Sequence, residues 1–199
     1  MKQSTIMNQA LSPAVQGLRP SATLLINERS KALMNEGKKV YRLGFGQSPF
    51  PVPNEVVQAL RDNAHQKDYL PVRGLPALCE AVAAFNKRTL GIDCEANQVM
   101  IGPGSKELIF SLQMAFNGDL LLPSPSWVSY EPQANMLNKK TWWIDTEESE
   151  GWKIKPSAID QICNRVFNPH RLLILNYPNN PVGNTYSICL LYTSPSPRD

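Results

Sequence analysis

The sequence predicts an α/β fold built on a parallel sheet with helices on both faces. From residue 98 onward, short apolar runs alternate with segments of helical periodicity. These runs are apolar along their whole length, which is typical of strands that are buried on both faces. Strands that alternate with helices in this way form parallel sheets. We therefore expect the core of the protein to be such a sheet.

The segment ahead of this part predicts an arm, helices and one strand. Residues 1–20 are polar and unpatterned, which favours a flexible arm. A strand is expected over 39–43 and leads into a rigid, proline-rich loop. Asn54 is expected to cap a helix over 55–67. An earlier helix is expected over 21–37, with apolar positions at Leu24, Leu25, Ala32 and Leu33.

The helix and strand patterns continue to the end of the α/β part. A helix starts near Gly74, with Pro76 in its first turn. Its expected buried positions are Leu78, Ala81, Val82 and Phe85. Strands are expected over 99–101, 119–123, 141–144 and 171–176, and helices over 126–137 and 156–163. The helix that follows Lys106 carries one apolar face, formed by Leu108, Ile109, Leu112 and Phe116.

Composition and charge exclude several classes of protein. The 20 Lys and Arg against 17 Asp and Glu give a net charge of +3, which is too weak and too evenly spread for a nucleic-acid-binding protein. No apolar run approaches the length of a membrane span, and no secretory signal begins the chain. The cysteines form no metal-binding pairs, so we expect no metal site and a reducing, cytoplasmic location. They are Cys79, Cys94, Cys163 and Cys189.

The last eleven residues, Cys-Leu-Leu-Tyr-Thr-Ser-Pro-Ser-Pro-Arg-Asp at 189–199, resemble the translation of a transposase sequencing adapter. Each of these residues matches a codon of the adapter in one reading frame. A disordered tail rich in serine and proline is the alternative. We expect residues 188–199 to be an artefactual tail and leave them out of the fold argument.

Three predicted strand ends carry residues suited to binding. In open parallel sheets, ligands bind beyond the carboxyl ends of the strands. The first end, Gly102-Pro103-Gly104-Ser105-Lys106, leads into a helix, whose N-terminus attracts anions such as phosphate. It lacks the spacing of a Walker loop, and a plain tight turn is the alternative.

The other two strand ends add an aromatic ring and an amide. Trp127 follows the second end, and its indole could lie against a flat conjugated ring, although a core tryptophan is the alternative. The third end reads Tyr-Pro-Asn-Asn-Pro-Val-Gly at 177–183, a rigid turn that holds an amide donor in place, although a turn without a ligand is the alternative. Together the three ends suit a phosphorylated aromatic cofactor.

At these residues the chain resembles the class I/II aminotransferases, in the aspartate aminotransferase group of fold-type-I pyridoxal-phosphate enzymes. Four motifs carry the resemblance, in the family's order, over about residues 20–187. They are Leu-Gly-Phe-Gly-Gln-Ser-Pro-Phe at 43–50, Tyr-Leu-Pro-Val-Arg-Gly at 69–74, Pro-Ser-Pro-Ser-Trp-Val-Ser-Tyr at 123–130 and Pro-Asn-Asn-Pro-Val-Gly at 178–183. Gln47-Ser48-Pro49 and Val182 depart from the family's usual residues.

The resemblance implies a fold and an activity. The fold is the three-layer parallel-sheet major domain of pyridoxal-phosphate-dependent transferases, incomplete here, with part of a small N-terminal domain. We expect the N-terminal arm and part of the small domain over 1–45, and the partial cofactor-binding large domain over 46–187. The implied activity is the transfer of an amino group between an amino acid and a 2-oxo acid by a homodimer.

The resemblance also implies roles for seven residues. Three of them would hold the phosphate of pyridoxal 5'-phosphate: Gly104, Ser105 and Lys106. Trp127 would stack on its ring, and Asn180 would donate to its phenolic oxygen. Asn180 and Gly46 would also contact the substrate, and Tyr69 would reach the phosphate of the partner subunit.

The family's remaining functional residues follow the Asn-Pro-x-Gly turn in sequence. They are an aspartate at the pyridine nitrogen, the catalytic lysine and an arginine for the substrate carboxylate. No lysine follows Lys155 here, so we assign no catalytic residue and expect the 199-residue chain to be inactive alone. The alternatives are a lyase or synthase of the same fold, a non-catalytic homologue such as the sensing domain of a regulator, and a nucleotide-binding α/β protein.

Overall fold

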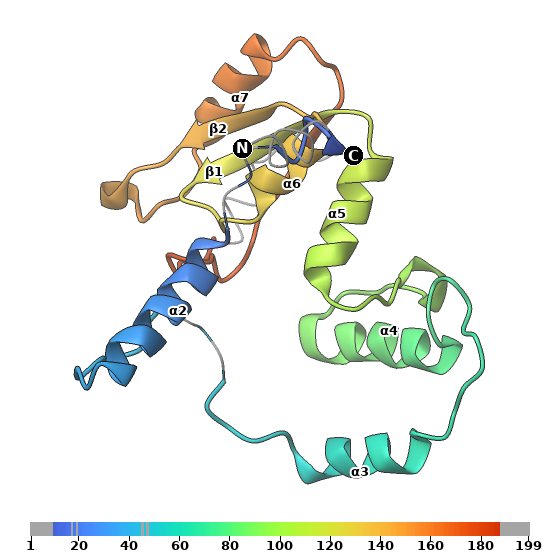
Figure 1. The fold of residues 1–199 in the computed structure, drawn as a ribbon. Helices are drawn as coiled ribbons and strands as arrows, with labels where there is room; N and C mark the ends of the chain where they lie inside the picture. The colour runs from blue at the N-terminus through green and yellow to red at the C-terminus, as the bar shows by residue number, and fades with distance from the viewer. Residues whose placement is uncertain (1–9, 17, 19, 45, 47, 188–199) are drawn as a thin grey trace. The chain divides into compact units, whose positions relative to one another are not determined.

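The computed structural model describes residues 10–16, 18, 20–44, 46 and 48–187, and the tail predicted at 188–199 lies outside them. The described residues divide into two compact units, which we describe one at a time (Figure 1). Unit 1 draws on Met1–Ala22 and Ile109–Asp199, and unit 2 is Thr23–Leu108. The domain division expected at residues 45 and 46 stays a prediction.

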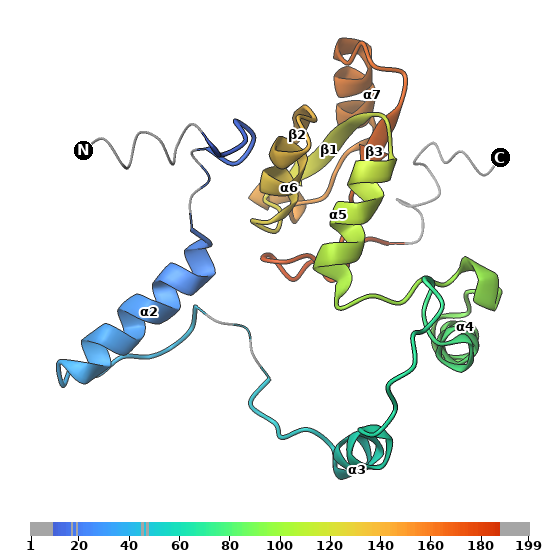
Figure 2. The same cartoon turned by 45° about the vertical axis from the view of Figure 1, so that its right-hand side comes forward.

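A three-stranded parallel sheet forms the centre of unit 1. Its strands are β1 (Asp119–Ser124), β2 (Thr141–Asp145) and β3 (Arg171–Leu173), in the order β2-β1-β3. Figure 2 labels all three. Both pairings of β1 are parallel: Leu120 faces Thr141 on one side and Leu172 on the other. The predicted parallel α/β architecture is therefore confirmed.

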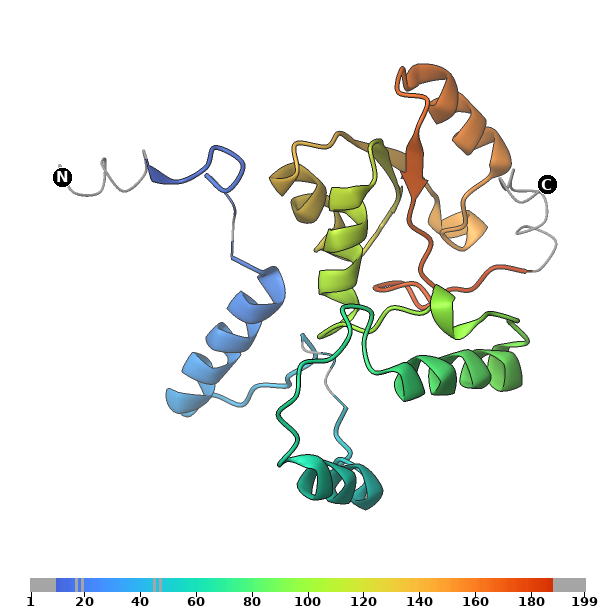
Figure 3. The same ribbon diagram turned by 90° about the vertical axis from the view of Figure 1, so that its right-hand side faces the viewer.

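Alternate residues of β1 point to opposite faces of the sheet, and both faces are covered. Leu120 and Leu122 pack with Tyr130 and Ala134 of α6 (Tyr130–Met136). Leu121 packs on the other face with Ile144, Ile154 and Val166, next to α7 (Pro156–Arg165). Figures 1 and 3 show α7 on one side of the strands, with α6 and α5 (Ser105–Ala115) on the other. Burial of each such side chain stabilises the fold by about 1.5–3 kcal/mol.

Three elements of unit 1 differ in extent or in burial from the predictions. β3 ends at Leu173, although the Ile174 N–H still donates to the Leu121 carbonyl over 3.2 Å. The predicted helix over 126–137 begins only at Tyr130, because a turn precedes it. In α5 the apolar face is shifted: Leu112 is 54% exposed, whereas the neighbouring Gln113 is fully buried. Its Nε2 donates to Gln133 Oε1 over 3.1 Å, so the helix buries an amide where a leucine was expected.

The described residues of unit 2 include nearly all of α2 (Ala22–Asn35), α3 (Asn54–Asn63), α4 (Pro76–Leu90), the short 3-10 helix η1 (Ala96–Gln98) and the first turn of α5. A second 3-10 helix, η2 (Glu148–Glu150), belongs to unit 1. Asn54 is the first residue of α3 and not its cap; Pro53 holds the cap position, which has no side-chain hydrogen bond. The predicted helices are present, but this cap was wrong.

The strands predicted over 39–43 and 99–101 are wrong, because neither segment pairs with a strand in the described part of the chain. Val99 is extended, and the Ile101 N–H donates to the Arg73 carbonyl over 2.8 Å. A strand needs a neighbour for its backbone groups, and a single hydrogen bond to a turn does not form a ladder. Both segments are therefore loops in unit 2.

The small core of unit 2 lies beside η1; of the positions predicted in α4, Val82 packs against it, but its centre lies on a neighbouring face of the helix. Cys79, Ala83 and Val99 are buried together. Leu78 and Phe85, which were expected inside, are 43% and 49% exposed. The predicted stripe has helical spacing, but the packed stripe is one position further along the helix, where it meets Val99. The apolar positions of α2 are also largely exposed, with Leu24 at 54% and Leu25 at 48%.

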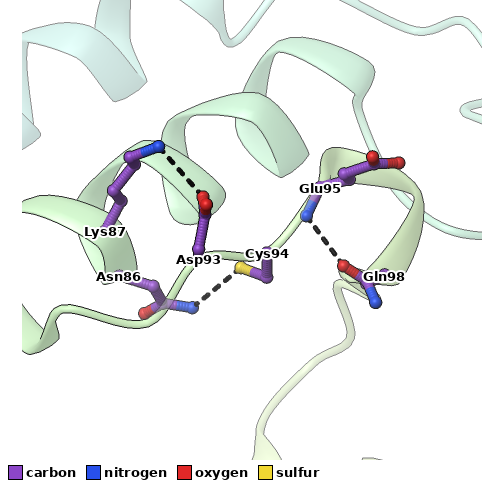
Figure 4. A network of polar contacts seen from close by, with 6 residues as sticks. All are labelled: Asn86, Lys87, Asp93, Cys94, Glu95 and Gln98. Carbon is purple, nitrogen blue, oxygen red and sulfur yellow. Dashed lines mark hydrogen bonds and ion pairs between the residues drawn. The ribbon is translucent and has the colours of Figure 1, made fainter.

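Short-range polar contacts close the connection from α4 to η1 (Figure 4). Lys87 Nζ pairs with Asp93 Oδ1 at 3.0 Å, although both side chains are exposed. The Asn86 amide donates to Cys94 Sγ over 3.8 Å. Gln98 Oε1 accepts from the Glu95 N–H over 2.9 Å and forms half of a capping box for η1. All of these contacts join residues that are close in sequence.

Candidate functional site

The loop after β1 carries the predicted ring-stacking residue. β1 ends at Ser124, and a cis peptide bond joins this residue to Pro125. Trp127 is half-buried and packs against the cluster around Leu120 and Leu122. Its ring meets Tyr130 edge to face, with centroids 5.2 Å apart and planes at 78°. Burial raises the pKa of the Tyr130 phenol above its ordinary value.

The turn after β3 carries the predicted amide donor. The Asn179 N–H donates to the Asn184 carbonyl over 3.0 Å, and the Gly183 N–H donates to the Asn179 carbonyl over 2.6 Å. Gly183 has a φ of 78°, a conformation that favours glycine. Asn180 lies at the exposed side of this turn, and a cis bond joins it to Pro181. Its side chain is thus presented on a closed turn.

A side-chain hydrogen bond joins these two segments. Asn179 Nδ2 donates to the Pro125 carbonyl over 3.4 Å, a long but recognisable bond. The segments follow β1 and β3, which are neighbours in the sheet and run parallel. Trp127 and Asn180 therefore lie on joined segments at the carboxyl edge of the sheet, the edge at which open α/β sheets bind ligands.

The same turn is fixed to the connection between β2 and α7. Asn184 Nδ2 donates to the carbonyls of Gly151 and Trp152, over 2.7 and 3.0 Å. The Ile154 N–H donates to the Tyr186 hydroxyl over 2.7 Å. The Tyr186 ring meets Tyr177 edge to face at 4.7 Å. Burial, and secondly the neighbouring Tyr186 phenol, raise the pKa of Tyr177 far above its ordinary value.

The predicted phosphate-binding residues belong to unit 2. Gly104 has a φ of 119°, and a methyl group in place of its hydrogen would meet nothing within 4 Å. Ser105 begins α5, and the Leu108 N–H donates to the Gly104 carbonyl over 3.3 Å. Ser105 and Lys106 are both exposed. The N–H groups of a first helical turn have no acceptor within the helix, so this turn offers donors next to an open glycine.

Two further predicted residues, Gly46 and Tyr69, also lie in unit 2. Tyr69 is fully exposed. Gly46 is exposed, and a methyl group there would meet nothing within 4 Å. The two residues that flank Gly46 in its motif, Phe45 and Gln47, lie outside the described residues. Unit 1 thus brings together the segments of two predicted residues, and unit 2 holds the other five.

The residues present fit pyridoxal phosphate in their chemistry. An open glycine at a helix N-terminus suits a phosphate, an indole suits a flat ring, and an exposed amide can donate to a phenolic oxygen. Among the described residues, no group of three or more His, Cys, Asp or Glu is placed to hold a metal ion. Within the same residues, no helix has the length and apolar character to cross a membrane.

The sequence motifs did not reveal the residues that anchor the turn carrying Asn180. Asn179, Asn184 and Tyr186 join it to two other segments, but they lie up to 54 residues away from their partners. Asn179 stood inside a recognised motif, so its position was visible. Its partner, a backbone carbonyl, leaves no signal in the sequence.

Comparison with known proteins supports the assignment that this geometry suggests. The sequence profile of the class I and II aminotransferases matches residues 38–191. An aspartate aminotransferase of Bacillus sp. (strain YM-2) is 31% identical over 186 residues, which are 91% of this chain and 47% of that protein. A probable aspartate/prephenate aminotransferase of Rhizobium leguminosarum bv. phaseoli is 28% identical over 89% of this chain and 45% of its own length.

Solved structures agree with the sequence relatives. The aspartate aminotransferase of Thermus thermophilus with maleate superposes with a TM-score of 0.82 at 30% identity, over 91% of this chain and 48% of that one. The aspartate aminotransferase of Rhizobium meliloti gives a TM-score of 0.81 at 28% identity, over 92% and 46%. The chain spans about half the length of these relatives. With a family profile that covers most of its residues, it belongs to the class I and II aminotransferases.

Proposed function

We propose that the whole protein is a pyridoxal-phosphate-dependent aminotransferase that moves an amino group between an amino acid and a 2-oxo acid. The observation that carries this proposal is a hydrogen bond between two segments at the carboxyl edge of a parallel sheet, where such sheets bind ligands. One segment is the loop after β1 that carries Trp127 (residues 125–129, the Trp127 loop), and the other is the turn after β3 that carries Asn180 (residues 179–184, the Asn180 turn). The relatives named above support it, since all of them are named as aminotransferases. A lyase or synthase of the same fold would share this half and is the alternative.

In this proposal each predicted residue has a defined task. The N–H groups and the hydroxyl around Gly104, Ser105 and Lys106 hold the phosphate, supported by the open glycine at the start of α5. Trp127 lies against the ring, and Asn180 donates to its phenolic oxygen. Bound pyridoxal phosphate supplies an electron sink for the substrate carbanion. The protein contributes orientation and hydrogen bonds.

We further propose aspartate, a dicarboxylic amino acid, as the first candidate substrate and an aromatic amino acid as the second. Gly46 and Asn180 would lie beside it. Relatives at about 30% identity are named as aspartate or aspartate/prephenate aminotransferases. The Thermus thermophilus structure was solved with maleate, a dicarboxylate. The unpaired thiols of Cys79, Cys94 and Cys163 support a cytoplasmic enzyme of amino-acid metabolism.

A homodimer is part of the same proposal. Unit 2 has a pocket of about 620 Å³ lined largely by apolar atoms, with Val72, Pro76 and Met100 in its wall. Val72 is 99% exposed, and Tyr69 beside it is fully exposed. Exposed apolar surface of this kind is typical of an interface between subunits. In the dimer, Tyr69 would reach the cofactor phosphate of the partner subunit.

A titration of the 199-residue chain with pyridoxal phosphate tests the cofactor proposal. We expect saturable quenching of tryptophan fluorescence, and no such change with ATP. Asn180→Ala should weaken binding about three- to tenfold, because it removes one hydrogen bond. Trp127→Phe should remove most of the quenching, whereas Trp143→Phe, a control at the sheet edge, should leave it. A chain that binds ATP but not pyridoxal phosphate would overturn the proposal.

A further inference from the structure

We propose that Asn179 is a positioning residue, which holds the Asn180 turn and the Trp127 loop in one fixed arrangement. This inference rests on the proposed function, since it concerns how two of the cofactor-binding residues are placed. It assigns to Asn179 a task that is distinct from ligand contact. Asn179 is half-buried, whereas its neighbour Asn180 is exposed.

Three polar groups of Asn179 form hydrogen bonds within the protein: its backbone N–H, its backbone carbonyl and its side-chain Nδ2. Its N–H donates to Asn184 and its carbonyl accepts from Gly183, which closes the turn on itself. Its Nδ2 donates outward to the Pro125 carbonyl over 3.4 Å. Pro125 lies two residues ahead of Trp127 in the loop after β1. One residue therefore closes the turn and also joins it to the neighbouring loop.

The other contacts of the turn lead elsewhere. Asn184 donates to Gly151 and Trp152, and Tyr186 accepts from Ile154, so both join the turn to the connection between β2 and α7. Among the side-chain hydrogen bonds that the described residues of this turn form, that of Asn179 is the one directed to the Trp127 loop. The chain thus offers a matched control: Asn184 has the same side chain and a similar anchoring task, but a different partner.

A positioning task matters because, under the proposed function, the two joined segments carry residues that contact the same cofactor. An indole stacks and an amide donates only when ring and donor keep a fixed spacing, and a displacement of about 1 Å has large effects on such sites. Asn180 is attached to Asn179 directly, so rotation of the turn moves the Asn180 amide. Loss of the link should weaken cofactor binding although no cofactor contact is removed.

The first test needs no cofactor. Hydrogen–deuterium exchange with mass spectrometry is measured on the 199-residue chain and on Asn179→Leu, which keeps the shape but loses the donor. We expect faster exchange in peptides from the turn (179–184) and also from the loop and helix start (126–133). Asn184→Leu should speed exchange in the turn and around 151–154, but not in 126–133. Unchanged exchange in 126–133 in Asn179→Leu would overturn the proposal.

The second test separates positioning from a general loss of structure. Asn179→Leu should weaken pyridoxal phosphate binding about three- to tenfold, and Asn184→Leu less than twofold. In an Asn180→Ala background, Asn179→Leu should add a smaller loss than in the parent chain, because part of its effect acts through Asn180. Asn179→His, whose ring N–H can take the place of the amide donor, should restore binding. Equal losses in both backgrounds would show a merely structural role.

The two proposals fail in different ways. If the parent chain binds no pyridoxal phosphate, the proposed function fails, and the exchange experiment still decides whether Asn179 joins the two segments. If the parent binds and Asn179→Leu binds equally well, the function stands and the positioning role is withdrawn.

Discussion

The contacts that stabilise the interior of unit 1 differ from those inside unit 2. In unit 1 the strand β1 is buried, with Leu122 at 0% exposure, and its hydrogen bonds join segments far apart in sequence. In unit 2 no residue of α3 is buried by the described chain, and the polar contacts of Figure 4 join near neighbours. The Trp127 and Asn180 motifs therefore lie beside a buried sheet that joins distant segments, whereas unit 2 has a small core around Cys79, Ala83 and Val99.

The difference shows what a motif alone can place. The Asn180 turn and the Trp127 loop are joined because the sheet brings β1 and β3 together. The Gly104 turn has its shape from its own glycine and the helix that follows it, and Tyr69 is fully exposed. Local sequence sets the conformation of a binding residue, but long-range packing sets its neighbours. The predictions below test whether the two units differ in this way.

The largest expected effect is in the core of the sheet. Leu122→Ala should lower the free energy of unfolding of unit 1 by about 2–5 kcal/mol, since it opens a cavity under a fully buried side chain. Leu60→Ala on α3, where the side chain is 72% exposed, should change the free energy of unfolding of unit 2 by less than about 0.5 kcal/mol. Urea-dependent pulse proteolysis at low protein concentration measures both. Similar losses in the two variants would contradict the contrast between the units.

A pair of glycines gives the next largest contrast. A methyl group at Gly118 would lie 2.4 Å from the His170 carbonyl oxygen, which is backbone and cannot move aside cheaply. Gly118→Ala should therefore cost about 1–3 kcal/mol. Gly46→Ala meets nothing within 4 Å and should be nearly neutral for stability. The same proteolysis assay applies, and a neutral Gly118→Ala would show that β1 and the segment before β3 are less tightly packed.

The buried amide pair of unit 1 should give a smaller, coupled effect. Gln113→Met leaves Gln133 without the amide donor of Gln113 and should cost about 1–2 kcal/mol. The double variant with Gln133→Met should cost less than the sum of the two single variants, because buried partners removed together leave fewer unpaired groups. Urea unfolding of all four proteins measures this coupling. Simple additivity would mean that the amides do not interact in solution.

The smallest expected effect concerns Tyr177 and alkaline pH. Its pKa is raised in the folded chain, chiefly by burial, so the unfolded chain loses this proton first as the pH rises. The corresponding stability is present below about pH 10 and is lost progressively above it. Tyr177→Phe should flatten this alkaline loss. It should be neutral or slightly stabilising at pH 7, since the buried hydroxyl lacks a hydrogen bond of standard geometry among the described residues.

Tyr186→Phe is the control for this pair. Its hydroxyl accepts from the Ile154 N–H, and its removal should cost about 0.5–1.5 kcal/mol at pH 7. Unfolding midpoints in urea between pH 7 and 11 compare the two variants. An alkaline loss that persists unchanged in Tyr177→Phe would assign the effect to another group, with Tyr130 the next candidate.

The sequence predicted the elements of the sheet better than their surroundings. The apolar runs at 119–123 and 141–144 became β1 and β2, because a continuous apolar run requires burial on both faces wherever it lies. The run at 99–101 has the same character, but it has no neighbouring strand in the described part of the chain. An apolar run therefore marks a candidate strand but does not show whether a partner strand lies beside it.

The same limit explains the errors on helices and at the site. In α4 the spacing of Leu78 and Phe85 is helical, but the packed face is set by Val99, which lies outside the helix. In the candidate site the identities of Trp127 and Asn180 were visible in their motifs. The bond of Asn179 to a proline carbonyl 54 residues earlier was not, since any residue has a carbonyl.

The strand order β2-β1-β3 also sets a sequence of events on the ribosome. Chains emerge from the N-terminus, and domains begin to fold as they appear. β1 and β2 can pair as soon as residue 145 is outside, whereas β3 is added to the other edge of β1 only after residue 173. The Trp127 loop can thus form on a nascent two-stranded sheet before the Asn180 turn has emerged from the ribosome. The turn reaches a partner that already has its shape, and the last step in assembling this edge is the arrival of Asn179.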